Sequence, residues 1–309
     1  IKFVGINREE YWREDTINIQ NLHSSSCSKE RKTKEKIMEM LKSFVYPPPP
    51  SILLNGMSVV GLAALAKIGW SEVTGNHLKY SKFASSSTST SPKPQPQKQP
   101  LGSFSSRTGM LCLYTPAFLA ASASFFVLPS DDLRFILLKS ALALHFFKRV
   151  FEVLFIHKYS GGMAVDSAIV ISSSYFSSTA LMLYSQNLTL GLTEPSFDMK
   201  LAGVVMFVVG IIGNLYHHVL LAKLRNEDGK KEYKIPKGGL FDVIICPHYL
   251  FEILVFWSFF LISQTIYSFT FAMGTMCYLI GRSYATRSWY LSKFDDFPKH
   301  VKALIPFVF

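Results

Sequence analysis

Long runs of apolar residues alternate with short polar segments along most of this chain. A helix needs roughly 20 apolar residues to cross a hydrocarbon core about 30 Å thick. Runs of that length occur at 52–70, 108–128, 133–156, 163–184 and 201–221, and 243–280 is long enough for two crossings. Barrel strands would instead alternate polar and apolar residues over about ten positions. The pattern predicts an all-α polytopic membrane protein with about seven transmembrane helices.

Composition and charge refine this prediction. Charged residues make up only 17% of the chain, whereas an ordinary soluble domain carries about a quarter. The net charge of +11 collects in alternate loops, since 71–107, 222–242 and the tail after 280 are basic and the loops between them carry Asp131, Asp132, Glu194 and Asp198. By the positive-inside rule the basic loops and the C-terminus are cytosolic. The charge therefore reports topology, and we expect no nucleic-acid partner.

The chain is expected to divide into a short leading segment and one membrane domain. Residues 1–39 mix acidic and basic side chains without apolar periodicity, so we expect them to be disordered or an artefact of the gene model. Residues 40–309 form the expected membrane domain. Within it, 84–106 is rich first in Ser and Thr and then in Pro and Gln, which predicts a flexible cytosolic loop.

Cysteine and histidine spacing indicates neither a disulfide framework nor a metal site. The four cysteines include no CxxC pair. The spacing of His217, His218 and His248 lacks the cysteine or carboxylate pattern of a zinc site. A glycosylation sequon begins at Asn187, on the side predicted to be lumenal, but it lies close to the end of a span.

Ionisable residues within predicted spans are costly and by default indicate function. The first group is Lys148, Arg149 and Glu152, near the cytosolic end of the third span. The two cations could simply extend to the membrane surface, and Lys148 and Glu152 are spaced for an ordinary ion pair along one helix.

A second group begins with Asn214 and His218, which are four residues apart and share a helical face. A helix-packing pair is the simpler interpretation of this spacing. The basic segment that follows carries two glycines, Gly238 and Gly239, and offers donors that a dinucleotide phosphate would need. Such a loop also fits solvated charge on the cytosolic side.

A third group joins His248, Tyr249 and Glu252 to the C-terminal tail. A buried carboxylate without a partner costs several kcal/mol or becomes neutral, so Glu252 implies a partner. His248 is nearest in sequence, and Tyr290 or a tail arginine could reach it if the last helix folds back. A purely structural ion pair remains an alternative.

Several of these segments resemble one membrane reductase family. The tail at 289–299 and 303–309 is similar to the C-terminal signature of steroid 5α-reductases, and 234–241 is similar to the loop before their sixth span. The motifs at 148–157 and 246–252 resemble the very-long-chain enoyl-CoA reductase branch. The resemblance covers roughly 140–309, and the whole chain looks most like plant-type members.

The resemblance implies a seven-helix bundle of the endoplasmic reticulum membrane. It also implies an oxidoreductase that takes NADPH from the cytosol and reduces a C=C bond conjugated to a carbonyl in a lipid. The cofactor-binding residues that it implies are Asn214, His218, Arg225, Tyr233, Lys234, His248, Arg282, Arg287 and Tyr290, with altered side chains at the two histidines.

By similarity to the enoyl reductase branch, Lys148 and Tyr249 would be the catalytic pair, with Arg149 and Glu252 as further candidates. Reduction builds negative charge on the carbonyl oxygen, so a donor must be aimed at it. Tyr249 could donate to that oxygen, and Lys148 or Arg149 could stabilise the enolate.

The sequence leaves several hypotheses for the substrate class. Steroid reductases bind the ketone with a tyrosine and a glutamate, and the matching tyrosine position here is Phe146. A 3-oxo-4-ene steroid is the first choice, and an enoyl thioester or a polyprenyl lipid is second. A non-enzymatic lipid-binding membrane protein is a further alternative.

Overall fold

The computed structural model describes residues 39–40, 43–78, 83, 102–159, 162–224 and 233–309. Nearly all of the segment 1–39, most of the expected flexible loop at 84–106, and Arg225 lie outside these ranges. The last residues of that loop, Ser103–Ser105, form strand β1, which pairs antiparallel with β2 (Gly162–Ala164).

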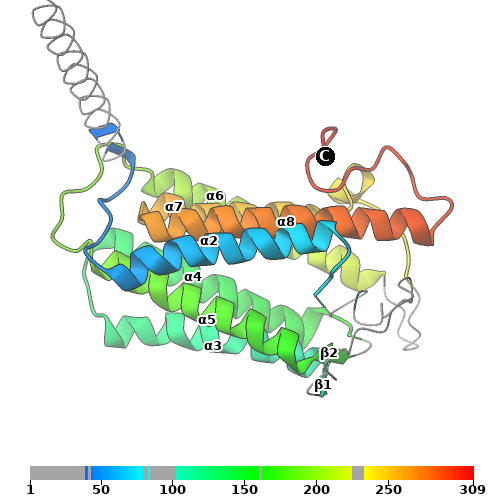
Figure 1. Cartoon of the computed structure of the whole chain (residues 1–309), viewed down its shortest axis with the longest axis horizontal. Coiled ribbons are helices and arrows are strands. Elements are labelled where there is room, and N and C mark those ends of the chain that lie inside the picture. Colours follow the sequence, from blue (N-terminus) through cyan, green and yellow to red (C-terminus); the bar gives the residue numbers. More distant parts are fainter. Residues whose placement is uncertain (1–38, 41–42, 79–82, 84–101, 160–161, 225–232) are drawn as a thin grey trace, which may run out of the picture.

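Helices dominate the described residues, and each predicted span contains one. They are α2 (Ile52–Val73), α3 (Ser106–Val127), α4 (Leu133–Phe151), α5 (Val165–Asn187), α6 (Lys200–Lys223), α7 (Pro247–Ser263) and α8 (Ile266–Lys293). A π-helical turn, η2 (Glu152–Ile156), extends α4, and a 3₁₀ turn, η3 (Gly239–Asp242), precedes α7. The helices lie side by side in an elongated bundle (Figure 1). The mostly helical fold is therefore confirmed.

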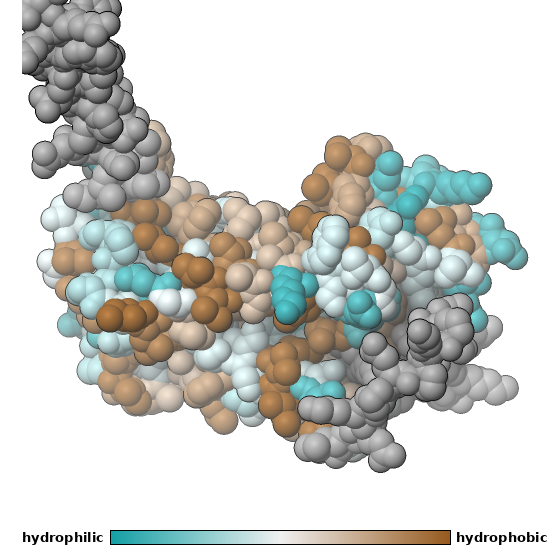
Figure 2. Space-filling model, viewed as in Figure 1, coloured by the Kyte–Doolittle hydropathy of each residue, from teal (hydrophilic) through white to brown (hydrophobic). Residues whose placement is uncertain are grey.

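Membrane association follows from the composition of the helices. Within the described ranges α2, α3 and α6 are long and apolar enough to cross a bilayer, and α7 is apolar but has only 17 residues. Hydrophobic side chains extend along the visible face of the bundle, and hydrophilic ones gather near the C-terminal tail (Figure 2). The other helices carry more polar residues, including Arg134 and Lys139 on α4. The count of seven spans thus stays a prediction.

Close packing joins the first and last helices of the bundle. Helix α2 lies along α8, α6 along α7, and α3 along α5. A Cβ added at Gly69 of α2 would lie 2.5 Å from the carbonyl oxygen of Cys277, and one added at Gly281 of α8 would meet the backbone of Gly69. Small residues let helix backbones approach closely in membrane proteins. The glycines therefore hold α8 directly against α2.

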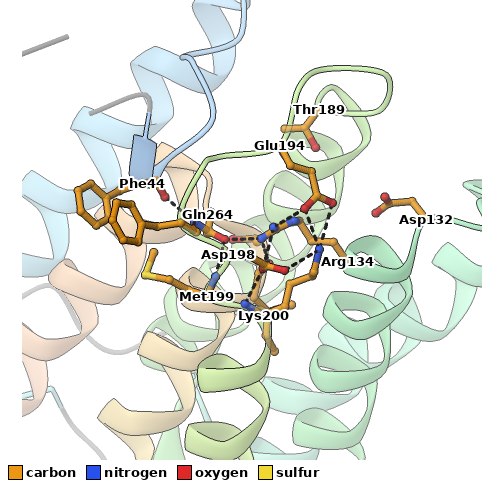
Figure 3. A network of polar contacts seen from close by, with 12 residues as sticks. Phe44, Asp132, Arg134, Thr189, Glu194, Asp198, Met199, Lys200 and Gln264 are labelled. Carbon is orange, nitrogen blue, oxygen red and sulfur yellow. Dashed lines mark hydrogen bonds and ion pairs between the residues drawn. The ribbon is translucent and has the colours of Figure 1, made fainter. Parts of the chain in front are cut away.

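A buried arginine organises one end of the bundle (Figure 3). Arg134, which is fully buried, donates to Gln264 Oε1 at 2.7 Å and to the carbonyl of Ile262 at 2.8 Å. Its other terminal nitrogen contacts Glu194 at 3.2 Å and Asp198 at 3.1 Å. The acidic loop between α5 and α6 is thereby fastened to the corner between α7 and α8. These segments were predicted to share one side of the membrane.

Gln264 completes this junction. Its backbone is left-handed, with φ of 50°, which turns the chain sharply from α7 into α8. Its side chain donates to the carbonyls of Phe44 at 2.6 Å and Phe197 at 2.8 Å, and accepts from the Met199 amide at 3.0 Å. One buried side chain therefore connects four separate parts of the chain.

Candidate functional site

A cavity of about 330 Å³ lies within the helix bundle, toward the end of α4 opposite Arg134. Side chains from helices α2 to α8 line it. Much of the wall is apolar, with contributions such as Leu65, Met110, Ile171 and Phe271. Its polar lining residues include Tyr114, Arg149, His218, Tyr249 and Glu252. An apolar cavity with a few convergent polar groups is typical of a site for a small molecule.

Glu152 is the centre of the charged group beside this cavity. It begins the π-helical turn η2 and is fully buried. Its carboxylate contacts Lys148 Nζ at 3.1 Å, Arg149 Nη1 at 3.0 Å and His218 Nδ1 at 3.0 Å. π-Helical turns occur frequently at functional sites. The ordinary ion pair that the spacing of Lys148 and Glu152 allowed is therefore present, as one contact of a larger cluster.

Asn214 connects three helices behind the cavity. Its side-chain oxygen accepts a hydrogen bond from Lys148 of α4, and its side-chain nitrogen donates to the carbonyl of His248, on α7, at 2.7 Å. Lys148 does not line the cavity, whereas Tyr249, the next residue after His248, does. The two members of the predicted catalytic pair therefore occupy different surroundings, one inside the polar cluster and one at the cavity wall.

Glu252 lies in the cavity wall without the partner that the sequence implied. It is 4% exposed, and no residue in the described ranges donates a hydrogen bond to its carboxylate. The carboxylate is therefore open to a hydrogen-bond donor in the cavity.

The tail arginines bind elsewhere, which excludes them as the partner of Glu252 that the sequence allowed as one alternative. Arg282 is almost fully buried and contacts both carboxylate oxygens of Glu72, on α2, at 2.8 Å. Arg287 donates to the backbone carbonyls of Val301 at 2.7 Å and Lys299 at 2.9 Å. Neither residue lines the cavity. The close packing of α8 on α2 brings Arg282 to Glu72.

The other predicted cofactor residues divide by position. Those that line the cavity are His218, Tyr233, Lys234, His248 and Tyr290. The hydroxyl of Tyr290 donates to the Lys234 carbonyl at 3.5 Å, which connects the last helix to the segment before η3. Asn214 lies behind the wall, and Arg225 is outside the described residues.

Two further residues of the site were not singled out from the sequence. His157 follows η2, and its ring lies 4.9 Å from that of His218. Burial, followed by the charge of His218, lowers the pKa of His157 to about 3, so this ring is neutral. Its position at the end of the 148–157 motif was the feature of the sequence that could have indicated a role in the site. Tyr114, on α3, accepts a hydrogen bond from Arg149, and no spacing in the sequence distinguishes it.

Ligand atoms of Glu152, His157 and His218 lie within 4.8 Å of one another, which is close enough for a metal site. The same carboxylate already contacts Lys148 and Arg149. Two cations beside a carboxylate oppose the binding of a third by electrostatic repulsion. The cluster is therefore better described as an ion network around Glu152.

Comparisons with known proteins agree with these features. The chain is 33% identical over 168 residues to the very-long-chain enoyl-CoA reductase of Dictyostelium discoideum, covering 54% of this chain and 55% of that protein. It is 42% identical over 110 residues to steroid 5-alpha-reductase DET2 of Gossypium hirsutum, covering 35% of this chain and 42% of that protein. With the human 3-oxo-5-alpha-steroid 4-dehydrogenase 1 it shares 37% identity over 117 residues, covering 38% of this chain and 44% of that protein.

The chain thus matches about half the length of these relatives or less. Residues 165–309 match the family described as 3-oxo-5-alpha-steroid 4-dehydrogenase. This region holds α5 to α8 and the C-terminal tail, and it includes His218, Tyr249 and Glu252 of the cavity. The family resemblance inferred from the sequence motifs is confirmed. Residues 165–309 of this chain are therefore similar to the 3-oxo-5-alpha-steroid 4-dehydrogenase family.

Proposed function

We propose that this protein is an NADPH-dependent reductase of a C=C bond conjugated to a carbonyl in a lipid, with a 3-oxo-4-ene steroid as the first substrate class. One observation carries the proposal: a single cavity has apolar walls that suit a lipid and the polar lining residues Arg149, His218, Tyr249 and Glu252. A reaction that builds negative charge on oxygen needs hydrogen-bond donors aimed at that oxygen.

The residues present fit a nicotinamide cofactor. Glu252 offers a buried carboxylate without a hydrogen-bond partner in the described ranges, as a carboxamide or a ribose hydroxyl would require. Lys234 places a cation at the cavity lining, where it would attract phosphate. His218, Tyr233, His248 and Tyr290 would complete the cofactor contacts. NADPH, when bound, supplies the hydride.

The residues of the chain would orient and stabilise the reacting lipid. Tyr249 at the cavity wall donates its hydroxyl proton as a hydrogen bond to a substrate or cofactor oxygen. Lys148 and Arg149, both held by Glu152, provide positive potential beside the developing enolate. Asn214 and Glu152 hold the Lys148 ammonium behind the wall, so Lys148 acts from there on the charge in the cavity.

A second substrate class, an enoyl thioester, is favoured by a specific observation. Phe146 is 1% exposed and lacks the hydroxyl expected of a steroid reductase at this position. The relative from Dictyostelium discoideum, matched over more residues than the two steroid-named relatives, bears the name of an enoyl-CoA reductase. A polyprenyl lipid belongs to the same reaction class.

We place the protein in the endoplasmic reticulum membrane with seven crossings and a cytosolic C-terminus. The basic loops and the cavity residues Tyr233 and Lys234 then face cytosolic NADPH. Reporter tags on the C-terminus and in the loop between α5 and α6 test this orientation by protease protection. A protected C-terminal tag would contradict it.

Enzyme assays separate the substrate classes. Detergent-purified protein is mixed with NADPH and a 3-oxo-4-ene steroid, a trans-2-enoyl thioester or a polyprenol-type enone, and absorbance at the nicotinamide band is followed. NADPH oxidation with one class identifies the substrate, and none with any class contradicts the proposal. Tyr249→Phe should abolish turnover and leave the melting temperature unchanged. The control Tyr184→Phe, at an exposed position outside the cavity, should leave turnover unchanged.

A further inference from the structure

Arg149 and two tyrosines, on helices α3, α4 and α5, lie in the wall of the cavity, and the ring of Phe146 packs against one of them. Arg149 Nη2 donates a hydrogen bond to the hydroxyl of Tyr114, and its guanidinium carbon lies 4.5 Å from the centre of the same ring. The Tyr175 ring lies 5.6 Å from both Tyr114 and Phe146. Tyr114, Arg149 and Tyr175 all line the cavity.

The Tyr114 hydroxyl accepts a hydrogen bond from a cation, Arg149. Hydrogen bonds polarise one another, so a hydroxyl that accepts from a guanidinium becomes a stronger donor of its own proton. The same guanidinium contacts Glu152 at 3.0 Å, so the ion network holds it in place. Packing among the rings and burial to 5% exposure also fix Tyr114. This hydroxyl is therefore both activated and preorganised.

Phe146 shows which side chain near Tyr114 cannot donate a hydrogen bond. It belongs to the same aromatic group, but it has no hydroxyl and is buried at 1% exposure. A carbonyl that enters this side of the cavity therefore meets the oxygen of Tyr114 rather than a donor at position 146. Tyr249 belongs to another helix, α7, and directly follows His248, a predicted cofactor residue.

We propose that Tyr114, activated by Arg149, is the catalytic hydrogen-bond donor to the carbonyl oxygen of the lipid substrate. This inference rests on the proposed reductase function and gives it a residue that neither the motifs nor the family match at 165–309 includes. Arg149 is then a positioning residue, since it acts through the tyrosine. Tyr249 serves the cofactor side of the cavity.

The reaction balances with this assignment. A hydride with its two electrons forms a C–H bond at the β-carbon, so the C=C bond is reduced and NADPH is oxidised. The π electrons move toward the carbonyl, whose oxygen becomes an enolate oxyanion. Tyr114 O–H donates a hydrogen bond to this oxygen and Arg149 supplies the nearby positive charge. A proton from water then forms the second new C–H bond, at the α-carbon, and restores the carbonyl.

Infrared difference spectroscopy tests the assignment without turnover. An enone steroid labelled with ¹³C at its carbonyl is bound to the purified protein in the absence of cofactor, and the labelled and unlabelled spectra are subtracted. A strong hydrogen bond lowers the carbonyl stretching frequency. We expect a lowered frequency in the wild type and in the control Tyr184→Phe, and its return toward the value in apolar solvent in Tyr114→Phe.

Steady-state kinetics provide the second readout. Removal of one donor to a developing oxyanion lowers kcat by about 10²-fold to 10³-fold. Because the interaction strengthens in the transition state, KM should change much less than kcat in Tyr114→Phe. If this variant fails to fold, 3-fluorotyrosine at position 114 keeps the ring and the hydroxyl and makes a stronger donor, so the carbonyl frequency should fall further.

The outcomes distinguish the inference from the function on which it rests. A wild type that oxidises NADPH with an enone while Tyr114→Phe keeps its kcat or its carbonyl frequency overturns the role of Tyr114 alone. An unchanged frequency with 3-fluorotyrosine does the same. A wild type that neither binds an enone nor oxidises NADPH overturns both proposals.

Discussion

The Gln264 junction predicts a large loss of stability from a single uncharged substitution. Gln264→Leu removes two acceptor contacts, from Arg134 Nη1 and the Met199 amide, and two donor contacts, to the carbonyls of Phe44 and Phe197. Leucine fills similar space, so packing changes little. The expected effect therefore comes almost entirely from polar groups that lose their partner.

The magnitude follows from the contacts. A buried donor or acceptor left without a partner costs about 1–3 kcal/mol. Arg134 Nη1 keeps its bond to the Ile262 carbonyl. The Met199 amide and the carbonyls of Phe44 and Phe197 are partly buried, so the cost of each lost partner lies in the lower part of that range. The variant should lose about 4 kcal/mol in free energy of unfolding. Its melting temperature should fall by roughly 10 °C.

Tryptophan fluorescence during thermal unfolding in detergent measures the difference, with Gln186→Leu as the matched control. Gln186 is also buried, but its side chain makes a hydrogen bond only to Thr189, at 2.8 Å, among the described residues, and its oxygen has no partner there. That substitution should cost less than about 1.5 kcal/mol. Equal losses for the two glutamines would refute the reasoning, because burial alone would then explain both.

Three further predictions concern packing, the ion network and pH. Gly281→Ala should lower the free energy of unfolding by about 1–3 kcal/mol, because the added methyl group meets the backbone of Gly69. The control Gly61→Ala, in open space on α2, should be neutral or stabilising in the same thermal melt. Glu152→Gln should cost about 3–5 kcal/mol by leaving buried cations unpaired, and Lys148→Met in the same chain should recover part of that loss; no recovery would show that the charges are not coupled. Hydrogen bonding from Lys200 lowers the pKa of Glu194 below its usual 4.5; for Asp198, burial acts to raise the pKa, but hydrogen bonds from Lys200 lower it below 3.8. Both carboxylates therefore contribute stability that is complete above these values and is lost as pH falls below them, so melts between pH 6 and pH 3 should show a decline that Glu194→Gln makes shallower.

Local sequence predicted the helices because their signal is itself local. Runs such as 52–70 and 201–221 are mostly apolar, and α2 and α6 occupy them with small differences at the ends. The seven-span count was harder to establish by the same criterion, because α4 carries Arg134 and Lys139 inside its run. Tertiary contacts satisfy those cations, and hydropathy does not register such contacts.

Residues close together in one motif were easier to place in the site than residues from distant helices. Lys148, Arg149 and Glu152 lie within about one helical turn, and their ion network follows from that spacing. Of the partners that the sequence allowed for Glu252, Arg282 is excluded because the close approach of α8 to α2 brings it to Glu72 instead.

The sequence by itself determined a helical membrane protein, its alternation of basic and acidic loops, and its resemblance to one reductase family, since these depend on composition and on contiguous motifs. Only the tertiary structure decided which polar groups meet. It brings Tyr114 of α3 to Arg149 of α4, places Glu252 in a cavity wall, and makes Gln264 a junction of four segments. The physical reason is that helix packing sets these contacts, through the close approach of small residues and the need of each buried polar group for a partner that is distant in sequence.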